Sequence, residues 1–132
     1  MTTPAVEPAM VFADAREMHA AALERLEQND IRDAAEKAWC AAKRATDALI
    51  LAITGVLPPR SPDTTRGLRT LAAADPAFHS LRDRYFSRQA ALHGDCFYTG
   101  WCEPIADTEL LIRETIEYVR DAEILARHHP PA

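Results

Sequence analysis

Three side chains in one short stretch have the chemistry to act on a phosphate ester. Arg88, Gln89 and His93 all lie in the segment Arg88-Gln-Ala-Ala-Leu-His93. An arginine guanidinium binds phosphate oxygens through paired hydrogen bonds and strengthens that hold as negative charge develops. Histidine changes charge near neutral pH and therefore acts as a general base or acid. With Gln89 to orient one of them, Arg88 and His93 would suffice for metal-independent RNA cleavage through the 2′-hydroxyl.

The position of Arg88 on its predicted helix needs an explanation. The apolar residues Tyr85 and Leu92 precede and follow it by three and four positions, so Arg88 lies on an apolar helix face. Arginine is rarely fully buried without a partner. Arg88 therefore serves a site, faces solvent or a second subunit, or pairs with a carboxylate of the last helix. Glu109 and Glu114 are the carboxylates considered for that pairing.

The spacing between Arg88 and His93 restricts how they would cooperate. Residues five apart are separated by about 140° around an ideal α-helix, so the two side chains do not stack on one face. A working pair requires the reach of arginine, a kink near Gly94, or the motif of a second subunit. A homodimer that joins two motifs across a two-fold axis is the most economical of these explanations.

Composition indicates an ordinary globular protein of one domain, residues 1–132. Apolar residues make up 48% and charged residues 27% of the 132 positions. No apolar run approaches the ~20 residues of a membrane span, and the first residues lack the pattern of a secretion signal. We therefore expect no membrane association and a cytoplasmic location. The chain has three cysteines, an odd number, and no Cys-x-x-Cys motif, which favours reduced thiols.

Charge is distributed unevenly along the chain. The net charge of −5 argues against non-specific nucleic-acid binding by the whole surface. Residues 60–93, however, carry six arginines against three acidic residues. The Arg88–His93 motif ends this basic segment, which is either a phosphate-binding region or a set of solvated charges on helix faces.

Hydrophobic periodicity predicts an all-α protein with four main helices, one short helix and no strand. The expected helices cover residues 8–28, 31–54, 65–74, 76–98 and 105–127. The second has apolar seams on two sides, which is typical of the central helix of a bundle. Asn29 or Asp30 is predicted to cap its start, Gly55 is its predicted C-terminal cap, and Asp75 is the predicted N-cap before Pro76. The prolines of residues 56–62 predict a non-helical connection.

Other candidate groups have simpler interpretations. His93, Cys96 and Cys102 match no common zinc spacing, so no metal or other cofactor is predicted. We expect His19 and His79 to be ordinary helix residues and His128-His129 to be a fraying tail. Aromatic residues are expected to pack in the core or an interface rather than stack on bases: Trp39, Phe86, Phe97, Tyr98 and Trp101.

Three segments together resemble HEPN domains. They are the helix Ala34-Ala-Glu-Lys-Ala-Trp-Cys-Ala-Ala-Lys43, the central proline loop and the Arg88–His93 motif. Within that group, Leu92-His-Gly-Asp-Cys-Phe-Tyr98 is similar to the PaREP-type helical proteins of prokaryotes. The resemblance covers about residues 10–127. Two positions depart from the catalytic families. Gln89 stands where those families usually have Asn, Asp or His, and Asp95 stands where some toxin members have a tyrosine.

The resemblance implies an up-and-down bundle of four to five helices that dimerises with the Arg88 and His93 motifs near the interface. It also implies an RNA or nucleotide ligand and metal-independent ribonuclease activity of the toxin–antitoxin type, with a nucleotidyltransferase-type partner protein. The alternative is a non-catalytic helical module that binds a partner protein. An adjacent nucleotidyltransferase gene would favour the first interpretation.

Overall fold

The computed structural model describes residues 6–129, which form five α-helices and contain no strand. Two further helical segments adjoin α4: a 3-10 turn (η1) before it and a π-helix (η2) after it. The bounds are α1 Pro8–Glu27, α2 Ile31–Thr54, α3 Ser61–Ala74, η1 Pro76–Phe78, α4 His79–Arg88, η2 Gln89–Tyr98 and α5 Ile105–His128. The predicted all-α class and bundle are confirmed.

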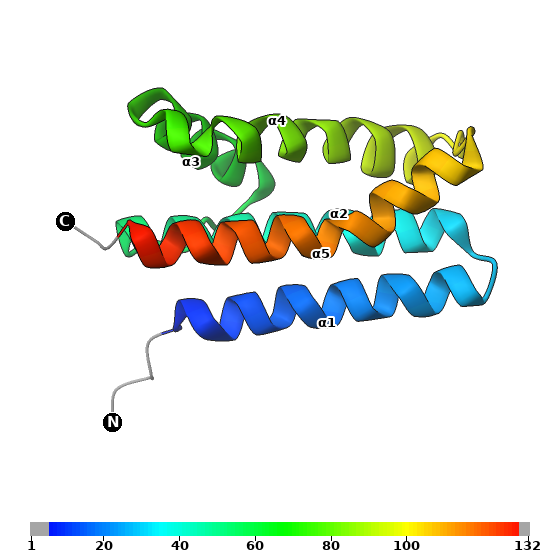
Figure 1. Ribbon diagram of the computed structural model, residues 1–132, viewed down its shortest axis with the longest axis horizontal. Helices are drawn as coiled ribbons and strands as arrows, with labels where there is room; N and C mark the ends of the chain where they lie inside the picture. Colours follow the sequence, from blue (N-terminus) through cyan, green and yellow to red (C-terminus); the bar gives the residue numbers. More distant parts are fainter. Residues whose placement is uncertain (1–5, 130–132) are drawn as a thin grey trace.

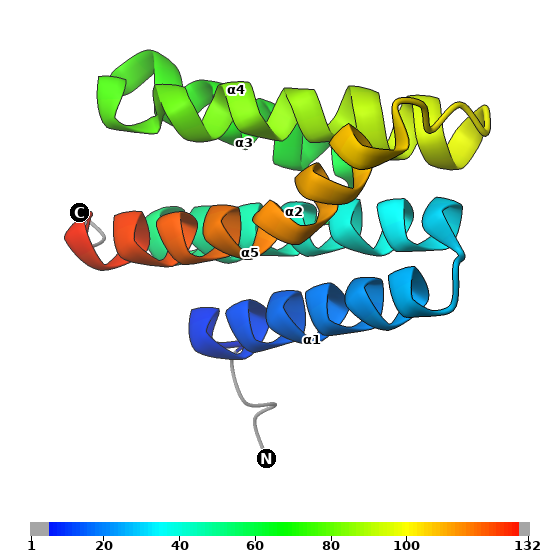
Figure 2. The same cartoon turned by 45° about the vertical axis from the view of Figure 1, so that its right-hand side comes forward.

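The helices lie in three layers, with α1 on one side, α2 and α5 in the middle, and α3 and α4 on the other side (Figure 1). The long helices run alternately up and down, and α3 is a short addition before the third of them. Turning the molecule by 45° keeps the same order, so the layering is not an effect of one view (Figure 2). Helix α1 begins and α5 ends at the same end of the bundle (Figure 1).

Helix α2 occupies the centre because small side chains line it on several sides. It contacts α1, α3, α4, η2 and α5. Its predicted seam is buried over most of its length, including Ala35, Ala38, Ala42, Ala45 and Leu49. Alanine lets neighbouring backbones approach closely and adds apolar burial without loss of side-chain entropy.

The predicted helix ends are confirmed where a local cap determines them. Asp30 caps α2 by accepting a hydrogen bond from the Asp33 amide, and Gly55 ends it with a positive φ of 79°. Asp75 caps the next segment by accepting a hydrogen bond from the Ala77 amide. These contacts lie within three residues in the sequence, which is why composition and spacing predict them.

One helix boundary was predicted wrongly. α3 begins at Ser61, not at residue 65, so Ser61 and Pro62 are helical rather than part of the connection. Proline has no amide hydrogen, and the first turn of a helix does not need one, so Pro62 suits this position. Tertiary contacts add to this start, since the Thr64 hydroxyl donates a hydrogen bond to the buried carboxylate of Asp47 on α2.

The carboxyl end of the α4–η2 helix is closed by a disulfide. Cys96 and Cys102 are bonded, whereas Cys40 is free. The expectation of reduced thiols is therefore wrong for this pair, because the turn at Gly100 returns the chain beside η2.

The expectation of a fraying tail is wrong for His129, since its Nε2 lies 3.1 Å from a carboxylate oxygen of Asp75.

No helix in the described range is both long and apolar enough to span a bilayer.

Candidate functional site

Arg88 is the last residue of α4 and is 4% exposed. Its Nε donates a hydrogen bond to the Thr115 hydroxyl at 3.0 Å, and its Nη1 donates to the Arg84 carbonyl at 3.3 Å. Its guanidinium carbon lies 5.5 Å from the ring centroid of Tyr118. Burial lowers the pKa of Arg88 because the protonated form loses hydration. Arg88 therefore links α4 to α5 inside the bundle.

The carboxylate partner predicted for Arg88 is absent. No acidic oxygen in the described part of the chain lies within ion-pair distance of its guanidinium. Glu109 pairs with Arg113 instead, 2.9 Å away on the same helix. Glu114 is exposed and makes no ion pair with Arg88. The alternative in which Glu109 or Glu114 pairs with Arg88 is wrong, because the Thr115 hydroxyl and the Tyr118 ring occupy the contact positions.

His93 faces a different helix. Its Nδ1 lies 2.8 Å and 3.0 Å from the two carboxylate oxygens of Glu36 on α2. Since a carboxylate accepts hydrogen bonds, this contact fixes the proton on Nδ1 of the neutral ring. No hydrogen bond to Nε2 occurs within residues 6–129, and the His93 side chain is 41% exposed. Nε2 is thus left with a free lone pair and access to solvent.

Aromatic rings surround His93. The Trp39 centroid lies 5.9 Å from that of His93, and Phe97 lies 6.3 Å away with its ring inclined by only 22°. Tyr98 lies 6.3 Å away and is 75% exposed. Trp101 is 64% exposed. Core packing is confirmed for Trp39, whereas Tyr98 and Trp101 lie outside the core of the single chain, and their packing in an interface stays a prediction.

The backbone that carries His93 is a π-helix rather than the ideal α-helix of the sequence argument. Its hydrogen bonds close i to i+5, as from the Thr99 amide to the Gly94 carbonyl at 3.1 Å. Residues five apart then lie about one turn from each other, so the offset of about 140° does not apply within η2. π-Helical segments are rare and occur often at functional sites.

Arg32 closes the end of this π-helix. Its Nη2 and Nε donate hydrogen bonds to the Phe97 carbonyl at 2.7 Å and 3.1 Å. Arg32 and Glu36 are four residues apart on α2 and so lie on the same face. Arg32 binds the carbonyl end of η2, and Glu36 binds the ring of His93. Neither side chain has a role predicted from the sequence, although Glu36 lies within the helix that carries the family resemblance.

Gln89 lines a pocket instead of contacting Arg88 or His93. We call it the arginine pocket; it has a volume of about 380 Å³ and is formed by Ser61, Pro62, Thr65, Arg66, Arg69 and Gln89. The Gln89 side chain makes no hydrogen bond to another described residue. The prediction that it orients Arg88 or His93 is therefore not met in this structure.

The three predicted site residues therefore face three different helices. Arg88 contacts α5, His93 contacts α2, and Gln89 faces α3 across the arginine pocket. The structure pairs His93 with Glu36 and does not place Arg88 against His93. Sequence spacing alone could not identify Glu36, because it lies 57 residues away from His93, its hydrogen-bond partner.

No cysteine supplies a thiolate near this site at neutral pH, because Cys40 is held as a thiol and Cys96 and Cys102 form a disulfide. Burial, assisted by the charge of Glu36, raises the pKa of the Cys40 thiol to about 11. Because Cys96 and Cys102 are bonded to each other, they are not available as the thiolate ligands considered with His93. No group of three or more His, Cys, Asp or Glu residues is arranged to hold a metal in the described range.

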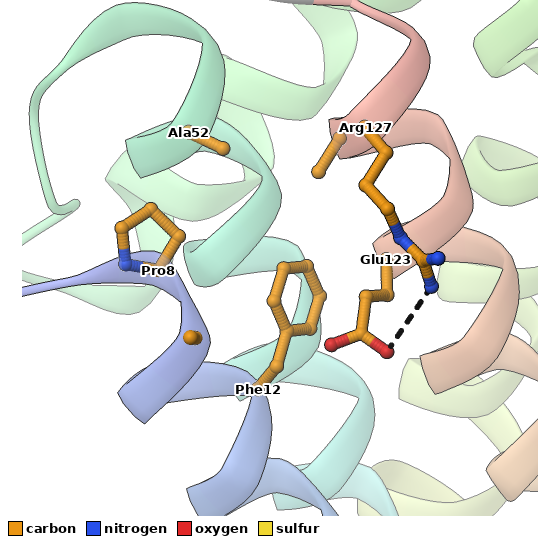
Figure 3. A pocket seen from close by; sticks show the side chains of 7 residues that line it. Pro8, Phe12, Ala52, Glu123 and Arg127 are labelled. Carbon is orange, nitrogen blue, oxygen red and sulfur yellow. Dashed lines mark ion pairs between the residues drawn. The ribbon is translucent and has the colours of Figure 1, made fainter.

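A second pocket lies at the end of the bundle where α1 begins and α5 ends. It has a volume of about 320 Å³ and is lined mainly by apolar groups such as Pro8, Phe12 and Ala52. Glu123 and Arg127 form an ion pair of 3.7 Å at its rim (Figure 3). With its two charges paired, this pocket has no free cation for a phosphate, and the His93 region is the better candidate.

Comparison with known proteins adds a family. Residues 11–116 match the model of the archaeal PaREP1/PaREP8 family. This range contains Glu36, the arginine pocket, Arg88 and His93. No curated protein and no solved structure matches the chain.

Proposed function

The chain belongs to the archaeal PaREP1/PaREP8 family, and on that premise we propose that it is a HEPN-like RNA-binding protein that cleaves RNA without a metal. The observation that carries the proposal is the His93–Glu36 pair. A histidine whose Nδ1 is held by a carboxylate and whose Nε2 faces solvent has the arrangement of a general base.

In the proposed reaction, His93 Nε2 takes the proton of a ribose 2′-hydroxyl as that oxygen attacks the adjacent phosphorus. A new 2′-O–P bond forms and the P–O5′ bond breaks. The 5′-oxygen leaves with a proton from water, which yields a 2′,3′-cyclic phosphate and a 5′-hydroxyl. Glu36 stabilises the imidazolium that forms and keeps the ring in position.

The nearby cation in this proposal is Arg32 rather than Arg88. Arg32 is exposed and makes no ion pair with an acidic residue of the described chain. Arg32 lies one turn of α2 from Glu36, and its Nη2 donates a hydrogen bond to the Tyr98 carbonyl. Arg88 is a positioning residue, because its guanidinium is held inside the bundle by Thr115 and anchors the helix that continues into η2.

Cleavage of a labelled single-stranded RNA in the presence of EDTA tests the proposal. We expect the wild type to produce a cyclic phosphate end and Glu36→Gln to lose at least tenfold in kcat, because general base catalysis contributes roughly 10²–10⁴-fold. His93→Ala should be inactive. An RNA with a 2′-deoxy nucleotide at the cleavage position should stay intact.

The matched control is His128→Ala, which removes an exposed histidine at the end of α5. It should cleave like the wild type. Equal cleavage by the wild type, His93→Ala and His128→Ala would show that the activity does not belong to this site, and the enzyme proposal would be rejected.

A non-catalytic interaction module is the second candidate, and exposed apolar residues favour it. Tyr98, Trp101 and Ile105 follow one another around the end of η2 and the start of α5, with exposed fractions of 75%, 64% and 46%. Apolar side chains clustered on a surface are typical of a protein interface. A second copy of the chain and a nucleotidyltransferase-type protein are the proposed partners. If the wild type does not cleave RNA, this second candidate is favoured.

A further inference from the structure

The arginine pocket contains hydrogen-bond donors of three kinds and no carboxylate. Ser61 and Thr65 supply hydroxyls, Arg66 and Arg69 supply guanidinium groups, and Gln89 supplies an amide. A phosphate has only acceptor oxygens and negative charge, so this set of side chains matches it in both properties.

The donors of the pocket are largely free. Arg69 makes no ion pair in the described part of the chain, and its guanidinium carbon lies 5.0 Å from the Phe86 ring centroid. Arg66 contacts Asp63 at 3.3 Å, but its side chain is 73% exposed. Such exposed pairs contribute about 0–1 kcal/mol and yield easily to another anion.

A buried hydroxyl behind the pocket also has unused hydrogen-bonding capacity. The Tyr85 side chain is fully buried next to Thr65, and its hydroxyl has no satisfactory hydrogen-bond partner within residues 6–129. Burial raises the pKa of Tyr85 to about 12, so at neutral pH the group is an O–H donor. The wall between α3 and α4 therefore has an unsatisfied donor directly behind a pocket-lining hydroxyl.

The pocket and His93 are connected by one short helical segment, because Gln89 and His93 both belong to η2. Gln89 and His93 are four residues apart in η2, where hydrogen bonds close i to i+5, so they lie somewhat less than one turn apart. Four residues rise about 6 Å in an α-helix, and less in a π-helix, which has more residues per turn. A strand of one or two nucleotides can span that distance.

We infer that the arginine pocket binds a backbone phosphate of the same RNA strand whose neighbouring phosphate is cleaved at His93. This inference rests on the proposed function and deepens it, because it assigns a phosphate subsite to Arg69 and Gln89. Arg69 neutralises the phosphate, and the Gln89 amide fixes its distance from the His93 ring.

Binding of a fluorescent single-stranded RNA to the full chain, measured over a series of salt concentrations, tests the subsite. Arg69→Met keeps a long side chain over Phe86 but removes the charge. We expect the slope of log affinity against log salt to decrease in magnitude by about 0.7, the value for one phosphate contact with a single strand. Gln89→Leu should weaken binding without changing the slope.

The control for these variants is Arg113→Met, which removes an exposed arginine that pairs with Glu109 on α5. It should keep the wild-type slope. Arg69→Met should also raise KM while leaving kcat unchanged, because the interaction is the same in the ground state and the transition state. A slope and KM for Arg69→Met equal to those of Arg113→Met would overturn the inference.

Failure of the proposed function is distinguishable from failure of the subsite. If the wild type neither binds nor cleaves RNA, the proposed function is rejected, and the subsite is then tested with millimolar inorganic phosphate alone. A phosphate-dependent rise in Tm in the wild type but not in Arg69→Met would support the pocket as a phosphate site. No rise in the wild type would overturn it.

Discussion

At the scale of the residue, the structure changes what Arg88 means. An arginine on an apolar face suggested a ligand or an ion pair, but its donors contact Thr115 and the Arg84 carbonyl. The Thr115 hydroxyl has a second partner besides Arg88, because it also donates to the Leu111 carbonyl at 2.8 Å. With no carboxylate paired to the guanidinium, packing is the main contribution that we assign to Arg88.

Replacing Arg88 by methionine tests that view. Arg88→Met keeps most of the volume and removes a buried charge, so its free energy of unfolding should lie within about 1 kcal/mol of the wild type or exceed it. Arg88→Ala should lose about 2–4 kcal/mol because it leaves a cavity. Urea denaturation measures both, and a methionine variant as unstable as the alanine variant would contradict the assignment.

His19 provides a pH-dependent contribution to stability. It is 4% exposed, with its Nε2 at 3.1 Å from the Ile112 carbonyl, and burial lowers its pKa. The unfolded chain therefore takes up the proton first as pH falls below about 6.5. The contribution is complete above that pH and is lost on acidification.

Denaturation at pH 7.5 and at pH 5.5 checks this sign. The wild type should lose more stability between the two than His19→Gln, by at most about 1.4 kcal/mol per pH unit for one proton. His128→Gln, an exposed change, should behave like the wild type. A steeper loss in His19→Gln than in the wild type would reverse the assignment.

At the scale of the element, η2 is held at several points. Arg32 binds its final carbonyls, Glu36 holds His93 near its middle, and the Cys96–Cys102 disulfide ties its last turn to the chain before α5. π-Helices are rare and mostly limited to a single turn, so these three contacts help to hold a longer one. The geometry at His93 therefore depends on contacts made by other elements.

Removing the disulfide tests its contribution to this element. Cys96 and Cys102 are six residues apart, and in the chain-entropy model a loop of this size stabilises by about 2 kcal/mol. We expect Cys102→Ser to lose about that much free energy of unfolding, whereas Cys40→Ser should change it less. Mass spectrometry of the unreduced wild type should find a single alkylatable thiol after denaturation, and three would contradict the bond.

At the scale of the whole molecule, the exposed aromatic residues bear on the proposed homodimer. The Tyr98 ring lies 6.3 Å from that of His93, and Trp101 follows three residues later, so an interface through these two residues would lie beside the candidate site. It would bring the motifs of two chains close together and leave His93 open to RNA and water.

Sedimentation of the wild type and of Trp101→Ser tests this interface. At micromolar concentration the wild type should sediment as about twice the chain mass of 14.7 kDa, and Trp101→Ser as a single chain. Val56→Ser, which changes a residue 63% exposed in the α2–α3 connection, should keep the wild-type behaviour. A wild type that sediments as one chain would reject the dimer.

The sequence by itself determined the helices and most of their ends. Periodicity, Asp30, Gly55 and Asp75 act within a few residues, so they predict where a helix begins or ends regardless of the rest of the chain. The alanine seams of α2 likewise identified the central helix, because a helix that is apolar on two sides must be covered on both.

Only the tertiary structure decided what each motif residue contacts. Glu36 meets His93 across 57 positions, and Arg88 meets Thr115 across 27, because the register of packed helices selects partners that no local spacing encodes. The change from α4 to the π-helix also altered the angle on which the sequence argument depended. Helix starts and ends depend on local contacts and can be predicted from the sequence. Packing register depends on the fit of all five helices at once, and the π-helical segment is held by contacts with other elements.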